Sequence, residues 1–201
     1  MSFISLTPMS ELEAVNLLLS AIGEAAVSSL ETATTVEVTQ AKKLLSNVNR
    51  AAQQKGWHFN TEWDVVLTRD SNDMIPLSES ILSVYQPGQL MTIRGRSGSM
   101  YAYDLDNNTF TWTKNLNNAV TITLLDFIDS PNTFRQYVTT RAARIFQEEI
   151  IGQVSAETVN RQEEAEAYAD LLDDDAERAG LNVAYGTLDM LNTTQIHRKL
   201  W

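Results

Sequence analysis

The sequence contains no cysteine and only two histidines, His58 and His197, which excludes several kinds of site. Without cysteine there is no disulfide framework, no thiolate zinc site and no thiol nucleophile. Glycine and proline are also scarce, with 8 and 4 among 201 residues, and 43% of the chain is hydrophobic. This composition excludes a collagen-like or wholly disordered chain. No apolar run approaches the roughly 18 residues that span a bilayer. The first five residues lack the basic region of a secretory signal, so we expect a soluble protein made in the cytoplasm.

Basic residues are few, and the acidic ones are concentrated in one segment. Lys and Arg number 15 against 26 Asp and Glu, a net charge of −11. That balance argues against a protein whose main task is to grip phosphate backbones. Between residues 148 and 177 a single base, Arg161, accompanies eleven acids. These are Glu148, Glu149, Glu157, Glu163, Glu164, Glu166, Asp170, Asp173, Asp174, Asp175 and Glu177.

Residues 9–56 and 131–180 show the period of amphipathic helices, two in each segment. Ser10 with Glu13, and Thr34 with Glu37, have the spacing of capping boxes. The start and stop residues expected for the four helices are, in order, Ser10 and Gly23, Thr34 and Gly56, Ser130 before Pro131 and Gly152, and Ser155 and Gly180. For the fourth helix we expect an inner stripe of Val159, Ala165, Tyr168, Leu172, Ala176 and Ala179.

Residues 57–130 change to a period near two, which indicates strands. Trp63, Val65 and Leu67 alternate with polar neighbours, and we expect residues 101–103 to pair with 109–112 across a turn at 104–108. Further hairpin turns are expected at 96–99 and 115–118, and 120–124 is a β-branched run. The fold class is therefore α+β: a four-helix bundle (residues 1–56 and 131–180) with an inserted small antiparallel β domain (57–130) and an extended C-terminal arm (181–201).

The arm, residues 181–201, is too apolar for a solvated segment but has no sustained period. It either packs on its own bundle or docks on a partner, and Trp201 beside Arg198 and Lys199 favours a partner. The candidate partner-binding residues are Tyr185, Leu188, Met190, Leu191, Ile196 and Trp201, with Leu200 beside them.

No pattern supports a catalytic, metal or cofactor site. Residues 104–108 open like a calcium loop, but the sixth and twelfth positions hold Thr109 and Asn115 where an EF-hand needs Gly and Glu, so a plain turn is favoured. Three consecutive acids, 173–175, point about 100° apart on a helix and cannot converge on one ion. Arg94 and Arg96 beside aromatic strands are a poor footprint for nucleic acid in so acidic a chain.

One enzyme hypothesis stays open. Glu62, Asp64 and Glu79 lie in the β region and could supply a carboxylate pair for glycan hydrolysis, although nothing in their spacing requires it.

Two blocks of the chain resemble a known family. The first includes Ala14-Val15-Asn16, Ile22-Gly23-Glu24 and the segment Gly56-Trp57-His58-Phe59-Asn60. The second is a set of positions along the third expected helix, namely Pro131, Phe134, Arg135, Tyr137, Val138, Ala142, Arg144 and Phe146. In order and spacing these blocks are similar to the tail tubular protein A family, the head-to-tail adaptors of short-tailed (podovirus) bacteriophages, and the Glu-rich fourth helix fits as well.

The resemblance implies a structural protein of the virion tail, made in the host bacterial cytoplasm and without catalytic residues. Such adaptors form a ring of about twelve copies between the portal protein and the tail nozzle, tail tubular protein B, with tail fibres as a further candidate partner and no insertion into a membrane. It also implies that the arm reaches a neighbour or the portal and that DNA passes without specific binding. We therefore expect part of the acidic helix to face the channel, with Glu163, Glu166, Asp170, Asp173 and Asp174 as candidates, because acids repel phosphates. The alternative is that these acids only keep the free subunit soluble.

Overall fold

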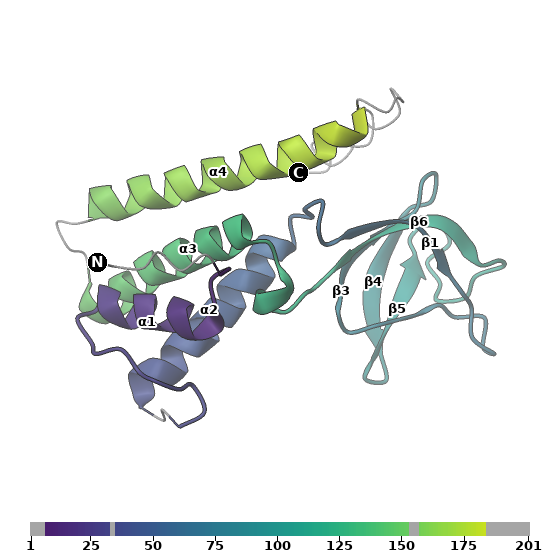
Figure 1. Cartoon of the computed structure of the whole chain (residues 1–201). Helices are drawn as coiled ribbons and strands as arrows, with labels where there is room; N and C mark the ends of the chain where they lie inside the picture. Colours follow the sequence, from purple (N-terminus) through teal and green to yellow (C-terminus); the bar gives the residue numbers. More distant parts are fainter. Residues whose placement is uncertain (1–6, 33–34, 153–156, 184–201) are drawn as a thin grey trace.

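A computed structural model describes residues 7–32, 35–152 and 157–183. It has a helical part and a β part side by side, with the chain passing from one to the other after α2 and returning before α3 (Figure 1). The α+β class with four helices and two antiparallel sheets is confirmed. The arm lies outside the described residues, apart from the end of the last helix.

The first two helices begin at side-chain caps. In α1 (Glu11–Ala21) the Ser10 hydroxyl accepts from the Glu13 backbone N–H, and the Glu13 carboxylate accepts from the Ser10 N–H, so the expected capping box is confirmed. In α2 (Val36–Gln53) the cap is Thr35, whose hydroxyl accepts from the Val38 N–H. The expectation of a cap at Thr34 was therefore wrong by one residue.

The β part consists of two three-stranded antiparallel sheets. The first has the order β1 (Thr61–Leu67), β6 (Leu116–Thr123), β3 (Ile81–Tyr85), and the second has the order β2 (Pro76–Leu77), β5 (Ser99–Asp104), β4 (Met91–Arg96). A separate small core of buried residues, including Ile75, Ala102, Trp112 and Ala119, lies between the strands.

Several expected features of the β part were wrong. The ladder partners of residues 99–104 are β4 and β2, so the expected pairing with 109–112 is reduced to one bridge, between Asp104 and Thr109. Phe110 and Trp112 still face this strand: the Phe110 ring packs on Tyr101 and Tyr103, and the Trp112 indole donates to the Ala102 carbonyl. The turn expected at 115–118 lies mostly inside β6. Trp63 is 44% exposed, because irregularities on both sides of Val65 break the alternation in β1. The turns at 96–99 and 104–108 are confirmed, the latter by Asp104, whose carboxylate accepts from the N–H groups of Asp106 and Asn107.

The third helix, α3 (Asn132–Ile151), lies at the centre of the helical part and packs on the other three helices. Its N-cap is Pro131, not Ser130, whose hydroxyl instead donates to the carbonyl of Phe127 in the short 3₁₀ helix η1 (Phe127–Asp129). Buried Phe134, Val138 and Phe146 join residues of α1 and α2 in one core. Gly152 ends the helix as expected.

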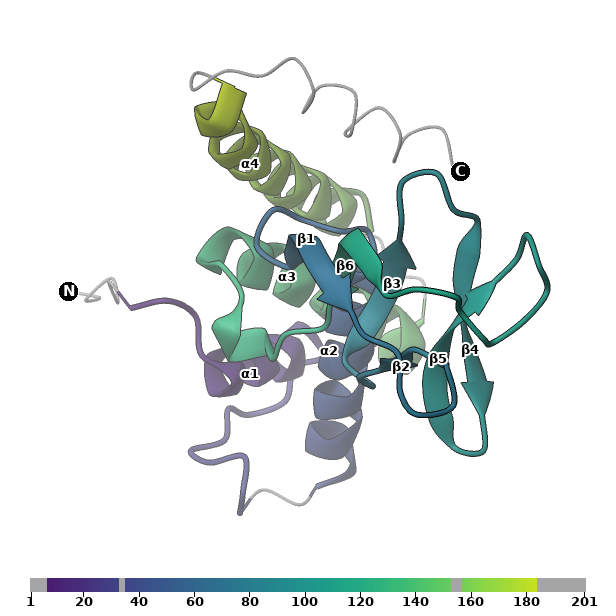
Figure 2. The same cartoon turned by 90° about the vertical axis from the view of Figure 1, so that its right-hand side faces the viewer.

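The last helix, α4 (Glu157–Val183), runs along α3 on the side away from α1 and α2 (Figures 1 and 2). It continues past Gly180, the expected end. The expected inner stripe was wrong in part: Tyr168 packs on the core, but Ala165, Leu172 and Ala176 are exposed, and among the described side chains of α4 the completely buried one is Leu171. The expected cap Ser155 lies outside the described residues, as do the side chains of Val159 and Ala179.

Candidate assembly interface

Between residues 161 and 178, where the side chains of α4 are described, three of them make apolar contacts with the core. Leu171 is 1% exposed and belongs to the main core. Tyr168 packs edge-on against Trp57 at 6.4 Å between ring centroids and lies 5.1 Å from the Tyr137 ring. Ala167 packs partly buried beside them. Because these three side chains are the apolar contacts of this described stretch with the core, polar contacts must contribute to the position of α4.

The first polar contact joins Arg144 of α3 to one acid of α4 and to one acid of α3. Arg144 Nε donates to Glu164 of α4 at 2.5 Å, and its Nη1 donates to Glu148 of α3 at 2.7 Å. Burial alone would lower the pKa of Arg144, but its bonds to Glu164 and Glu148 outweigh that effect and raise it above its ordinary value. Arg144 therefore remains charged and ties α4 to α3.

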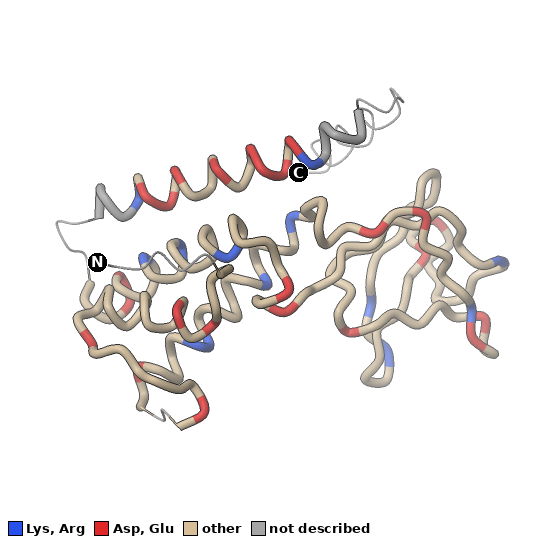
Figure 3. Tube along the Cα trace, viewed as in Figure 1, with Lys and Arg blue, Asp and Glu red and all other residues tan. Residues whose placement is uncertain are grey.

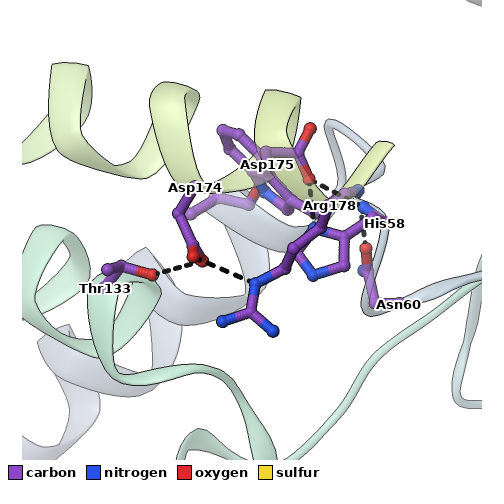
Figure 4. Close-up of polar contacts among 8 residues, drawn as sticks. His58, Asn60, Thr133, Asp174, Asp175 and Arg178 are labelled. Atoms are coloured by element: carbon purple, nitrogen blue, oxygen red, sulfur yellow. Dashed lines mark hydrogen bonds and ion pairs between the residues drawn. The ribbon is translucent and has the colours of Figure 1, made fainter. Parts of the chain in front are cut away.

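The second polar contact lies towards the C-terminal end of α4, where the adjacent acids Asp174 and Asp175 bind different partners (Figure 4). The Asp175 carboxylate accepts from the His58 backbone N–H at 2.9 Å and lies 2.6 Å from His58 Nδ1. Asp174 accepts from the Thr133 hydroxyl at 2.9 Å and from Arg178 at 3.0 Å. Partial burial opposes ionisation of Asp174, but the bonds from Arg178 and Thr133 hold its pKa below the ordinary value. These acids fasten α4 to the start of α3 and to the segment after α2.

That segment, Gly56-Trp57-His58-Phe59-Asn60, connects the helical and β parts. Trp57 is buried, and its indole donates to the Ala52 carbonyl at 2.8 Å. Asn60 accepts from the Trp57 N–H and donates to the carbonyls of Gln53 and Thr123. Gly56 has a φ of +74°, and a Cβ there would come within 2.7 Å of Ile122.

The returning chain is held at the same place. The fully buried Gln53 donates to the Leu125 carbonyl and accepts from the Leu125 N–H, both at 2.8 Å. Both crossings between the two parts are thus tied to the end of α2, which fixes the β part relative to the helices.

The surface on the two sides of α4 differs in charge. On the side towards α1 is a groove of about 560 Å³, with Glu163, Glu166 and Asp170 on α4 and Leu17, Ser20 and Ala21 on α1 among its lining residues. On the side towards the end of α2 is a pocket of about 420 Å³ lined by Lys55, Arg141, Arg144 and Arg161, together with Glu164, Ala165, Tyr137 and Tyr168. Figure 3 shows the acids along α4 and the bases beneath it. We call these the acidic groove and the basic pocket.

The candidate channel residues occupy different environments. Glu163, Glu166, Asp170 and Asp173 are exposed, at spacings of three and four along one side of α4. Asp174 is half-buried with its carboxylate engaged by Thr133 and Arg178. Sequence reasoning missed the basic pocket, although Arg141 and Arg144, three apart on one helix face, were a signal that could have indicated it.

The described part of the chain gives the hydrolase hypothesis no support. Glu62, Asp64 and Glu79 are all exposed; Glu62 and Asp64 belong to β1, while Glu79 precedes β3, and these strands pair with opposite edges of β6. Arg94 and Arg96 lie over the rings of their own sheet's Tyr103 and of Phe110.

Two searches of the described residues gave nothing. In residues 7–32, 35–152 and 157–183 no three His, Asp or Glu side chains gather as a metal site would require. Among the helices of that same part, none has the length and apolar character needed to cross a membrane.

The described residues thus form a two-part subunit with a braced connection between its parts and differently charged hollows on the two sides of α4. The model of the tail tubular proteins matches residues 12–181, so the chain belongs to the tail tubular protein family. It is therefore a structural component of the bacteriophage tail, and its place is the virion tail. The matched region includes both the helices and the β part. No curated protein matches the chain.

Proposed function

We propose that this chain is the head-to-tail adaptor of a short-tailed bacteriophage. In this role it forms a ring of about twelve copies, attaches to the portal protein, receives the nozzle of tail tubular protein B, and leaves a channel for DNA ejection, with tail fibres as a further candidate neighbour. The observation that carries the proposal is the family match across 170 residues, counted from 12 to 181, which covers the whole two-part subunit.

The braced connection suits such a role. A ring that holds the portal and the nozzle in fixed positions requires subunits whose helical and β parts do not move relative to each other. Asn60 and Gln53 provide this by tying both chain crossings to α2 through buried hydrogen bonds.

The arm is proposed to bind the portal or a neighbouring subunit through Tyr185, Leu188, Met190, Leu191, Ile196 and Trp201. Because α4 extends to Val183, the variant that removes the arm without shortening this helix lacks residues 184–201. We expect this variant to retain its helices by circular dichroism but to lose portal attachment. Unfolding or aggregation of the variant would instead assign the arm to the subunit's own core.

For DNA passage we propose that exposed acids of α4 border the channel, where they repel phosphates. Glu163, Glu166, Asp170 and Asp173 are available for this by exposure. Asp174 is not, because its carboxylate is bonded to Thr133 and Arg178. If all of the exposed acids lay on the outer wall of the assembled ring, the channel proposal would be refuted.

The experiment that tests the adaptor function is a mass measurement by light scattering, on the chain alone and mixed with the cognate portal protein. A ring of defined mass on the portal would support the proposal. A monomer that ignores the portal would refute it, and turnover assays of Glu62→Gln, Asp64→Asn and Glu79→Gln on glycan would then test the hydrolase alternative.

A further inference from the structure

The acidic groove and the basic pocket lie on opposite sides of the line along which α4 packs on α3. The groove uses Gln136, Thr140 and Ala143 of α3, and the pocket uses Tyr137 and Arg141. In the end-on view of Figure 2, α1 and α2 are on different sides beneath α4. The hollow on one side of α4 is therefore lined mainly by acids, and the hollow on the other side is lined mainly by bases.

The charges in the two hollows are of similar number. The groove presents Glu163, Glu166 and Asp170, and its one base, Arg144, is already bonded to Glu148 and Glu164. The pocket is lined by the same Arg144 and by three further bases, Lys55, Arg141 and Arg161, with Glu164 as its acid. Lys55 is exposed, with its Nζ 4.8 Å from the centroid of the Tyr168 ring. Arg141 is 40% exposed and 3.5 Å from Glu164.

We propose that the acidic groove of one subunit binds the basic pocket of the next copy in the ring. A closed ring uses heterologous contacts, in which one surface of each subunit meets a different surface of its neighbour. Two complementary surfaces on opposite sides of α4 meet that requirement, whereas two like-charged surfaces would repel. The occupant of both hollows is thus a second copy of this chain. This inference rests on the proposed ring and names the residues that close it.

The inference also reduces the set of α4 acids that can border the proposed DNA channel. Glu163, Glu166 and Asp170 are committed to the neighbour, so Asp173 and Glu177, which are exposed further along α4, remain for the channel. Because the contact is formed largely by exposed charges, ring closure weakens as salt is raised and the Debye length falls from about 10 Å at 0.1 M to about 3 Å at 1 M.

Charge reversal provides the test. The groove variant is Glu163→Lys with Asp170→Lys, and the pocket variant is Lys55→Glu with Arg161→Glu. In each of them both surfaces have the same sign, so neither assembles alone. Their equal mixture places each reversed surface against a matching one and restores a ring with alternating subunits, which a copy number of about twelve permits. With one variant labelled with ¹⁵N, native mass spectrometry finds equal numbers of the two in every ring.

Two further variants separate assembly from folding. The chain with both surfaces reversed closes with itself and not with the unchanged chain, even though it contains all four substitutions. Matched controls, Glu24→Lys with Glu31→Lys and Lys43→Glu with Lys114→Glu, alter the net charge equally at exposed positions elsewhere and retain the ring.

The measurements are made under the condition, with or without portal protein, in which the unchanged chain forms a ring. Two outcomes would overturn this inference alone. In the first, the groove variant or the pocket variant forms rings by itself as well as the unchanged chain does. In the second, neither the mixture of the two variants nor the chain with both surfaces reversed forms rings. If the unchanged chain closes under neither condition, the proposed ring and this inference fall together.

Discussion

Leu171→Ala tests how α4 is held. Leu171 is 1% exposed, and among the described side chains of α4 it is the one buried completely in the main core. Truncation of a buried leucine to alanine costs about 2–5 kcal/mol. Because α4 meets the bundle mainly through α3, we expect this cost to fall on the local opening of α4 and not on the whole domain.

The assay is hydrogen exchange followed by mass spectrometry. Each 1.4 kcal/mol is about a factor of ten, so amides of α4 should exchange between about thirtyfold and a few thousandfold faster. Amides of α1 and α2 should keep their protection. Leu172→Ala removes the same atoms from a side chain that is 44% exposed and should leave α4 protection almost unchanged. Equal acceleration in both variants, or acceleration spread over the whole chain, would refute the local-opening argument.

Three other predictions concern stability. Asn60→Ala leaves the buried Trp57 N–H and the Gln53 and Thr123 carbonyls without their partner. We therefore expect the free energy of unfolding, measured in urea, to fall by about 2–4 kcal/mol. Unchanged stability would contradict the argument that Asn60 holds the connection between the helical and β parts. Gly56→Ala should lower Tm by more than Gly23→Ala, because both have positive φ but only the Gly56 Cβ would meet Ile122; equal shifts would show that the contact relaxes without cost. Burial opposes ionisation of Asp104, yet bonds from Asn107 and Asp106 hold its pKa below the ordinary value, so its contribution to stability is present above about pH 4 and is lost as the pH falls through the lowered pKa. Urea titrations from pH 7 to pH 3 should show this decline, and Asp104→Asn should make it shallower.

Local signals were predictable from the sequence, and long-range ones were not. The capping box of Ser10 and Glu13 spans three residues, and the turn after Asp104 is made by that residue's own carboxylate, so each could be inferred where it stands. The turn at 96–99 likewise joins β4 to β5, so this pairing could be inferred from the sequence. The pairing of β5 with β2 could not, because Pro76 and Leu77 lie 25 and 23 residues before their partners Tyr101 and Met100, with no local signal between them.

The register of α4 shows the same limit in the candidate interface. Leu171 and Leu172 are adjacent, and the apolar period cannot choose between them because charged residues occupy inner as well as outer positions. The inner acids Glu164 and Asp175 are satisfied by Arg144 and His58, which are 20 and 117 residues away. A cluster of acids in the sequence therefore separates in the structure into a docking face and an exposed side, and only the exposed side is available to a neighbour.

In the proposed ring, assembly depends on a residue that the inferred contact between subunits does not include. The groove combines side chains of α4 with side chains of α1 and α3, and the pocket combines them with side chains of α3 and with Lys55 just after α2, so both hollows exist only while α4 is docked. Ring closure by Leu171→Ala should therefore fall by the fraction of its subunits in which α4 is open, although the substitution changes no charge. Raising salt should deepen the loss, because Arg144–Glu164 and the inferred contact are both electrostatic. If exchange shows α4 open in most subunits of Leu171→Ala and they still close rings as the unchanged chain does, the inferred contact does not use the docked position of α4.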